Sequence, residues 1–182
     1  MHFKTLQMKN IALNLIVLCL LTSFKTFRGG PGDYAPVIRK QAEDMGQALV
    51  KKNYKEYIRY TDPRIILEMG GEAAFADTLK SYEAQWHRYN MRVFDINVED
   101  PSWVIDTAGE LQSSIPVVTQ MKVSGGLVTS VSTFIGISKD RGKNWVFIDC
   151  GQSDYGSIRK KYPDLSSKLV VPTPGNPTFR AD

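Results

Sequence analysis

The first half of the chain places apolar residues at the spacing of α-helices. Four of them recur every three or four positions, namely Ile38, Ala42, Met45 and Leu49. Pro36 suits the first turn of a helix, because its fixed φ angle is already helical. The pattern therefore predicts an amphipathic helix over residues 36–52, with its apolar stripe packed on a core.

Two further helices are predicted after a segment rich in tyrosine. Thr61-Asp62-Pro63 is typical of a helix start, and Gly70-Gly71 is typical of a helix end. These residues predict a short helix over 63–69 and a longer one over 72–89. The apolar stripe of the longer helix consists of Phe75, Leu79, Tyr82 and Trp86.

From Met91 onward the pattern changes to the alternation of β-strands. The strand candidates are residues 92–98, 114–123, 127–137 and 144–150. Ser124-Gly125-Gly126 and residues 139–142 are typical of hairpin turns. Helices followed by consecutive antiparallel strands predict an α+β fold, a single domain over 36–150, rather than a doubly wound parallel sheet.

The first 24 residues have the layout of a secretory signal peptide. Lys4 and Lys9 precede an apolar run over residues 11–21, which is too short to span a bilayer that needs about 20 apolar residues. We expect an exported, periplasmic or secreted protein without a membrane span in its mature form, the alternative being an anchoring or buried N-terminal helix. Lipidation of Cys19 is disfavoured, because Leu18 stands where a small residue normally precedes a lipid-modified cysteine.

The segments on either side of the domain differ from it in composition. Residues 25–35 are rich in glycine and predict a flexible linker. Residues 151–182 are expected to form a mostly irregular C-terminal extension, because its tail carries Pro172, Pro174 and Pro177.

Composition and charge indicate a globular protein and argue against a nucleic-acid-binding protein. The chain of 182 residues is 42% hydrophobic and 23% charged, which is normal for a globular protein. Loss of the leader leaves 21 basic residues, two fewer than the 23 of the whole chain, against 19 acidic ones. This near-neutral balance gives no support for nucleic acid as a partner. Only Cys150 remains after the leader, so no intramolecular disulfide is expected.

The order of these elements resembles the nuclear-transport-factor-2-like superfamily, which also holds ketosteroid isomerases and polyketide cyclases. The resemblance is carried by the helix at 36–52, the aromatic link NYKEYIRYTDPRII, the helix ending at Trp86 and the closing strands with ISKDRGKNWVFID. It implies N-terminal helices packed in the concave face of a curved antiparallel sheet, a cystatin-like cone with a pocket at its open end. It does not imply one function, because this fold holds enzymes, binders and scaffolds.

The alternation also sorts the strand residues onto two faces. One face is mostly aliphatic and is expected to receive the helices. The other would expose Phe134, Trp145 and Phe147, an unusual apolar patch for a monomer. We expect a homodimer interface there, formed by Gln120, Ser132, Phe134, Trp145 and Phe147. The alternative is that tail residues such as Leu169 and Phe179 fold back over the patch.

Six residues are the candidates for pocket walls, namely Tyr57, Tyr82, Trp86, Thr119, Thr133 and Cys150. The three aromatics recur at helical spacing, which favours positions in a plain core over positions in a pocket wall. Cys150 is expected to point inward as a small buried apolar residue, with a reactive pocket thiol as the alternative.

No catalytic, metal or nucleotide-binding motif stands out, so no catalytic residue and no cofactor is assigned. His87 follows Glu83 by four residues, which favours a solvated helix pair over a zinc site. Asp149, Asp106 and Asp95 would act as bases only if desolvated in a pocket, and solvated or capping roles are favoured.

The sequence thus favours an exported domain that binds a small apolar ligand or a protein partner. Two alternatives remain, a small isomerase, dehydratase or cyclase that uses a buried carboxylate, and a structural or accessory envelope protein.

Overall fold

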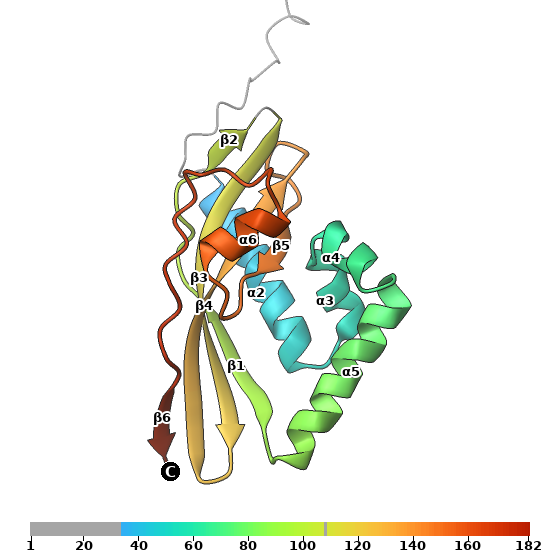
Figure 1. Cartoon of the computed structure of the whole chain (residues 1–182), viewed down its shortest axis with the longest axis vertical. Coiled ribbons are helices and arrows are strands. Elements are labelled where there is room, and N and C mark those ends of the chain that lie inside the picture. Colours follow the sequence, from blue (N-terminus) through green and yellow to red (C-terminus); the bar gives the residue numbers. More distant parts are fainter. Residues whose placement is uncertain (1–33, 108) are drawn as a thin grey trace, which may run out of the picture. The chain divides into compact units, whose positions relative to one another are not determined.

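The computed structural model describes residues 34–107 and 109–182, which form one α+β body (Figure 1). The expected leader, Cys19 and most of the expected linker lie outside these residues. In chain order the elements are α2 (Ala35–Val50), α3 (Tyr54–Tyr60), α4 (Pro63–Glu68), α5 (Glu72–Arg88), β1 (Arg92–Val98), β2 (Ile105–Thr107), β3 (Glu110–Val123), β4 (Gly126–Ser138), β5 (Val146–Asp149), α6 (Tyr155–Lys161) and β6 (Thr178–Ala181). The α+β prediction is confirmed. No helix in the described ranges is long and apolar enough to cross a membrane.

Helix α2 carries the predicted apolar stripe into the core. Ile38, Ala42 and Met45 are buried, and Pro36 lies in the first turn. Gly46 allows the helix to approach strand β1 closely, because a Cβ atom there would lie 2.8 Å from Cγ2 of Ile96. Larger residues at position 46 would therefore push α2 away from the sheet.

The two short helices begin at side-chain caps. The Asn53 carboxamide accepts a hydrogen bond from the Glu56 backbone N–H at the start of α3. Asp62 accepts one from the Arg64 N–H at the start of α4, as the Thr-Asp-Pro sequence predicted. Helix α3 itself was not predicted, and it turns the tyrosine-rich segment into a core element with Tyr57, Ile58 and Tyr60 buried.

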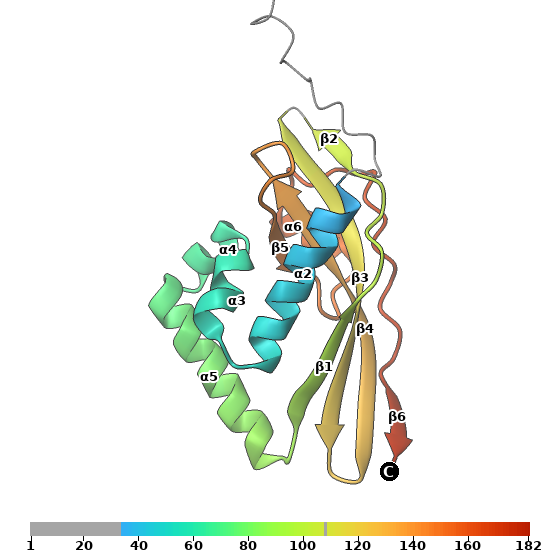
Figure 2. The ribbon, with the colours of Figure 1, turned by 180° about the vertical axis from the view of Figure 1, so that it is seen from behind.

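The six strands of the described ranges pair in one antiparallel sheet (Figure 2). The main order is β1-β3-β4-β5, with β2 added beside β3 and β6 added beside β4. Strand β1 carries an irregularity between Val93 and Asp95. Strand β3 pairs with β2 along its first part and with β1 along its second part. Strand β4 pairs with β6 along its first part and with β5 along its second part.

The register corrects the predicted faces of the sheet. Val123 pairs with Gly126, so the turn contains only Ser124 and Gly125, and Ile115 lies opposite Phe134. The predicted register of β4 and β5 against β3 was therefore wrong by one residue, which exchanges the two faces of these strands. Phe134, Trp145 and Phe147 lie in the core under the helices, together with Ile115 and Val117. The expected dimer thus loses the exposed aromatic patch on which it was predicted.

The other expected interface residues do not form a shared surface either. Ser132 pairs with Val117 and is half-buried on the helix side. Gln120 pairs with Thr129 on the opposite side of the sheet. Because paired residues share a face, these two side chains point away from each other.

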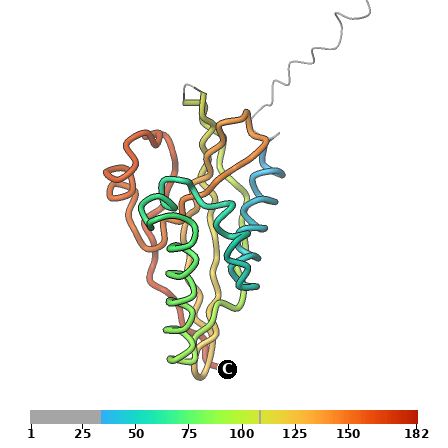
Figure 3. The backbone as a smooth tube through the Cα atoms, turned by 90° about the vertical axis from the view of Figure 1, so that its right-hand side faces the viewer, coloured from blue at the N-terminus to red at the C-terminus, as the bar shows by residue number. Residues whose placement is uncertain are grey.

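The C-terminal extension covers the second face of the sheet. Its residues Ile158, Tyr162, Leu165 and Leu169 pack with Ile135, Ile137 and Ile148 in a separate apolar cluster. Figure 3 shows α2 in blue and the extension in red on opposite sides of the sheet. Helix α6 and strand β6 were not predicted. The alternative to the dimer, a tail that folds back over the sheet, agrees with the position of Leu169. The tail covers the aliphatic face of the sheet, however, and Phe179 stays exposed.

Candidate functional site

The candidate site is a cleft between helix α5 and the edge of the sheet. Its volume is about 270 Å³, and it is lined from the end of α2, the turn before α3, the second half of α5 and the start of β1. Half of the twelve lining residues are apolar, namely Leu49, Val50, Leu79, Trp86, Met91 and Val93. Such a wall suits an apolar body of small size.

The cleft exists because only the first half of α5 is anchored. Phe75 is the only buried residue among the 17 of this helix. Further along, Leu79 and Trp86 are half-buried, and Tyr82 is 50% exposed. The rings of Tyr82 and Trp86 stack with centroids 6.4 Å apart and an angle of 17° between their planes. The apolar stripe predicted for α5 therefore continues past the core into the wall of the cleft.

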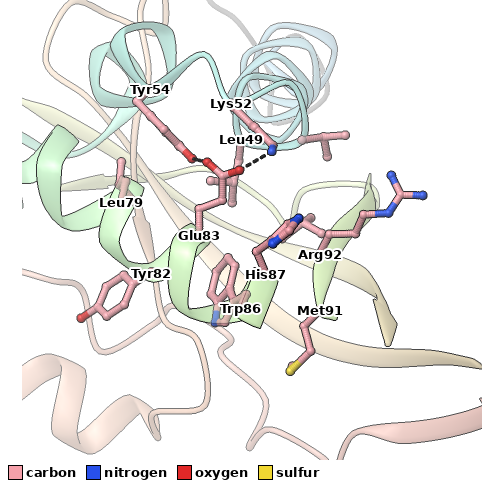
Figure 4. A pocket seen from close by; sticks show the side chains of 12 residues that line it. Leu49, Lys52, Tyr54, Leu79, Tyr82, Glu83, Trp86, His87, Met91 and Arg92 are labelled. Carbon is pink, nitrogen blue, oxygen red and sulfur yellow. Dashed lines mark hydrogen bonds and ion pairs between the residues drawn. The ribbon is translucent and has the colours of Figure 1, made fainter. Parts of the chain in front are cut away.

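One carboxylate forms the polar centre of the cleft (Figure 4). The Tyr54 hydroxyl donates a hydrogen bond to Oε2 of Glu83, and Lys52 forms an ion pair with Oε1. The Lys52 ammonium and the Tyr54 hydroxyl lower the pKa of Glu83, whereas burial and the Glu83 hydrogen bond raise the pKa of Tyr54. Lys52 has a φ of 58°, a left-handed conformation unusual for lysine.

His87 and Arg92 extend the polar side of the cleft. His87 lies one turn after Glu83, and its field adds slightly to the lowering of the Glu83 pKa. Figure 4 shows Arg92 reaching away from Glu83 on the side of β1. Both residues of the predicted Glu83–His87 pair line the cleft, but the Glu83 carboxylate binds Lys52 and Tyr54.

Of the six predicted pocket residues, the structure brings two together, Tyr82 and Trp86. Tyr57 is buried against Phe75 with ring centroids 6.4 Å apart, which is a core position. Thr119 is half-buried opposite Ile96 on the helix side of the sheet. Thr133 and Cys150 lie under the extension, on the face away from the cleft.

Sequence reasoning missed Lys52 and Tyr54 as site residues. Their signal was weak, because a Lys-Lys-Asn-Tyr segment after a helix is also typical of a solvated turn. Only the fold shows that Glu83, which is 29 positions after Tyr54, comes back to meet both side chains.

Cys150 behaves as a buried structural residue. Burial, with a smaller contribution from the Asp149 charge, raises the pKa of its thiol to about 12.

We expect the Cys150 thiol of a Cys19→Ser chain to react with an aromatic disulfide reagent at pH 8 at least about a hundredfold more slowly in the folded protein than in urea. Release of the chromophore measures both rates. Equal rates would contradict the packing of the extension over this cysteine.

Asp149, one of the three candidate bases, lies on the helix side of the sheet, opposite Phe134. Its carboxylate accepts a hydrogen bond from the Gly151 N–H at 2.8 Å, which is a turn-forming role. The protein atoms around it raise the pKa of Asp149 even though solvent reaches the side chain. Asp149 does not line the cleft, so it cannot act on a ligand held there.

The remaining candidates in the described ranges offer less chemistry. A second cavity of about 320 Å³ lies beside the start of α4. Its charged groups already have structural partners, since Arg64 binds Asp62 and the Asp140 carboxylate accepts from the Asn144 N–H. No group of three metal-binding side chains occurs in the part of the chain that the structure describes.

Comparison of the chain with protein-family models, with curated proteins and with solved structures gives no match. The geometry of the cleft is therefore the basis for a proposed function.

Proposed function

We propose that this protein binds a small amphipathic ligand in the cleft between α5 and β1. The observation that carries the proposal is the combination of six apolar wall residues with one polar centre, the Lys52–Glu83–Tyr54 group. The apolar body of the ligand packs between Trp86 and the start of β1. A hydroxyl or a similar polar group of the ligand exchanges hydrogen bonds with the polar centre.

We further propose that the domain is a divergent nuclear-transport-factor-2-like cone, exported by its N-terminal leader. Support for the fold comes from the helices that precede the sheet and from a cleft between those helices and one edge of the sheet. Support for export comes from the charge and length of the apolar run over residues 11–21.

Binding of a neutral apolar dye, N-phenyl-1-naphthylamine, tests the cleft. We expect the dye to fluoresce with the full chain and to bind about tenfold more weakly, or worse, to the Trp86→Ala variant, because the stacked indole forms much of the wall. A fluorescence titration measures the dissociation constant. The N-terminal apolar run could bind dye itself, so variants that share it are compared.

Trp103→Ala is the matched control. Trp103 is 58% exposed and does not line the cleft, so its loss should leave dye binding unchanged. Far-UV circular dichroism checks that each variant is folded, and Tyr82→Ala replaces Trp86→Ala if the latter is not. Equal weakening by cleft and control variants, or none by either, would overturn the proposal.

A further inference from the structure

Three chain segments meet at one end of the sheet. They are the turn between α5 and β1, the turn between β3 and β4, and the end of strand β6 (Figures 1 and 2). The register fixes this meeting, because Val123 pairs with Gly126 and Gly126 pairs with Ala181. We call this region the turn end.

A row of basic residues crosses the sheet at the turn end. Arg92 of β1 lies opposite Lys122 of β3, Lys122 lies opposite Leu127 of β4, and Leu127 lies opposite Arg180 of β6. Paired residues share a face, so the three basic side chains project on the same side. All three are exposed, and none forms an ion pair with another described residue.

This row costs stability in the isolated protein. Like charges directly opposite each other on neighbouring strands repel, and Arg92 and Lys122 are such a pair. The acidic residues nearest in register are Asp95, which pairs with Gln120, and Asp182, whose N–H donates to the Gly125 carbonyl. The row places three cationic side chains together with no carboxylate directly opposite any of them, and this arrangement favours an anionic partner.

Exposed aromatic rings lie on both sides of the sheet at the turn end, because Phe179 and Arg180 are consecutive strand residues and point to opposite faces. Tyr89 is 68% exposed in the α5–β1 turn, Phe94 is 47% exposed in β1, and Phe179 is 60% exposed in β6. The Arg92 guanidinium lies 5.9 Å from the centroid of the Phe94 ring. Rings beside arginine and lysine are suited to the boundary between lipid head groups and acyl chains, where the ring is buried and the cation meets phosphate.

We propose that the turn end docks on the surface of an anionic lipid bilayer. Arg92, Lys122 and Arg180 contact the head groups, and the three exposed rings enter the interfacial layer. Met91 and Arg92 also line the cleft, so docking places the cleft beside the lipid surface. The inference rests on the register and the exposed rings, and it stands whether or not the cleft binds a ligand.

A fluorescent label at the turn end tests this orientation. The full chain with Cys19→Ser and Phe94→Cys is labelled with a nitrobenzoxadiazole dye, since Cys150 is buried. We expect the label to brighten on vesicles that contain phosphatidylserine and not on vesicles of phosphatidylcholine alone. The same label at Leu67→Cys, on the exposed face of α4, should not respond, which separates docking of the turn end from anchoring by the N-terminal segment.

Charge variants complete the test. The combined change Arg92→Gln, Lys122→Gln and Arg180→Gln should weaken vesicle binding about a hundredfold, at about fivefold for each charge. A control with Lys143→Gln, Lys160→Gln and Lys168→Gln removes the same charge elsewhere and should keep the response. The proposal is overturned if the Phe94 label stays silent, if both triple variants respond alike, or if soluble polyglutamate brightens the label and vesicles do not. That last result would indicate that the turn end binds an acidic polypeptide instead of a lipid surface.

Discussion

Replacing Trp145 by alanine is expected to lower the free energy of unfolding by about 4 kcal/mol. The indole is 1% exposed and packs edge-on against Tyr34, with ring centroids 6.4 Å apart. Its Nε1–H donates a hydrogen bond to the Gly142 carbonyl at 3.0 Å. Alanine would leave a large cavity under α2 and remove the donor for that carbonyl, and both effects destabilise the fold.

Urea unfolding measures this effect, with Trp103→Ala as the control. Trp103 is mostly exposed, so its replacement should change the free energy of unfolding by only about 0.5 kcal/mol or less. A much larger loss for Trp145→Ala than for Trp103→Ala distinguishes a core position of Trp145 from the surface position that alternation predicted. A loss below about 1 kcal/mol, together with a change in oligomeric state, would restore the predicted dimer surface.

Local signals predicted the helices well. The expected helices over 36–52, 63–69 and 72–89 correspond to α2 at Ala35–Val50, α4 at Pro63–Glu68 and α5 at Glu72–Arg88. Each begins or ends at a proline, an aspartate cap or a glycine pair, whose effects act within a few residues. Helix α3 was missed because its tyrosines bury several sides of a short helix and leave no simple stripe.

The faces of the sheet could not be predicted from alternation alone. Both sides of strand β4 are buried, with Phe134 under the helices and Ile135 under the extension. Alternation reports which residues share a side, but with apolar residues on both sides it does not say which side the helices cover. The choice then depends on the length of one turn, and a difference of one residue reverses it.

The residues of the cleft, too, could be predicted only in part from the sequence. Tyr82 and Trp86 were predicted because they lie on one helix stripe. The polar centre was not, because it joins the turn after α2 to the middle of α5 across the fold. Side chains that meet only through tertiary structure leave no spacing signal in the sequence.

One guanidinium group links the extension to the start of α4, in addition to the apolar packing and the β4–β6 pairing. Arg64 donates from Nε and Nη2 to the two carboxylate oxygens of Asp62, at 2.8 and 2.9 Å. Its Nη1 donates to the Asp164 carboxylate at 2.7 and 2.6 Å, 100 residues further along the chain. Asp62 also connects α4 to the sheet, because its N–H donates to the Phe147 carbonyl at 3.0 Å.

Replacing Arg64 by alanine is therefore expected to lower the free energy of unfolding by about 3 kcal/mol, since the Asp62 side chain is only 4% exposed and would keep a charge without its partner. Arg64→Lys should recover only part of the loss, because an ammonium group cannot bind both carboxylates as the planar guanidinium does. Asp164→Ala is the matched control. The Asp164 side chain is 48% exposed, so its removal should cost about 1 kcal/mol or less in urea unfolding. Equal losses for Arg64→Ala and Asp164→Ala would show that the Asp62 contact adds nothing, and that Arg64 acts only as a tie to the extension.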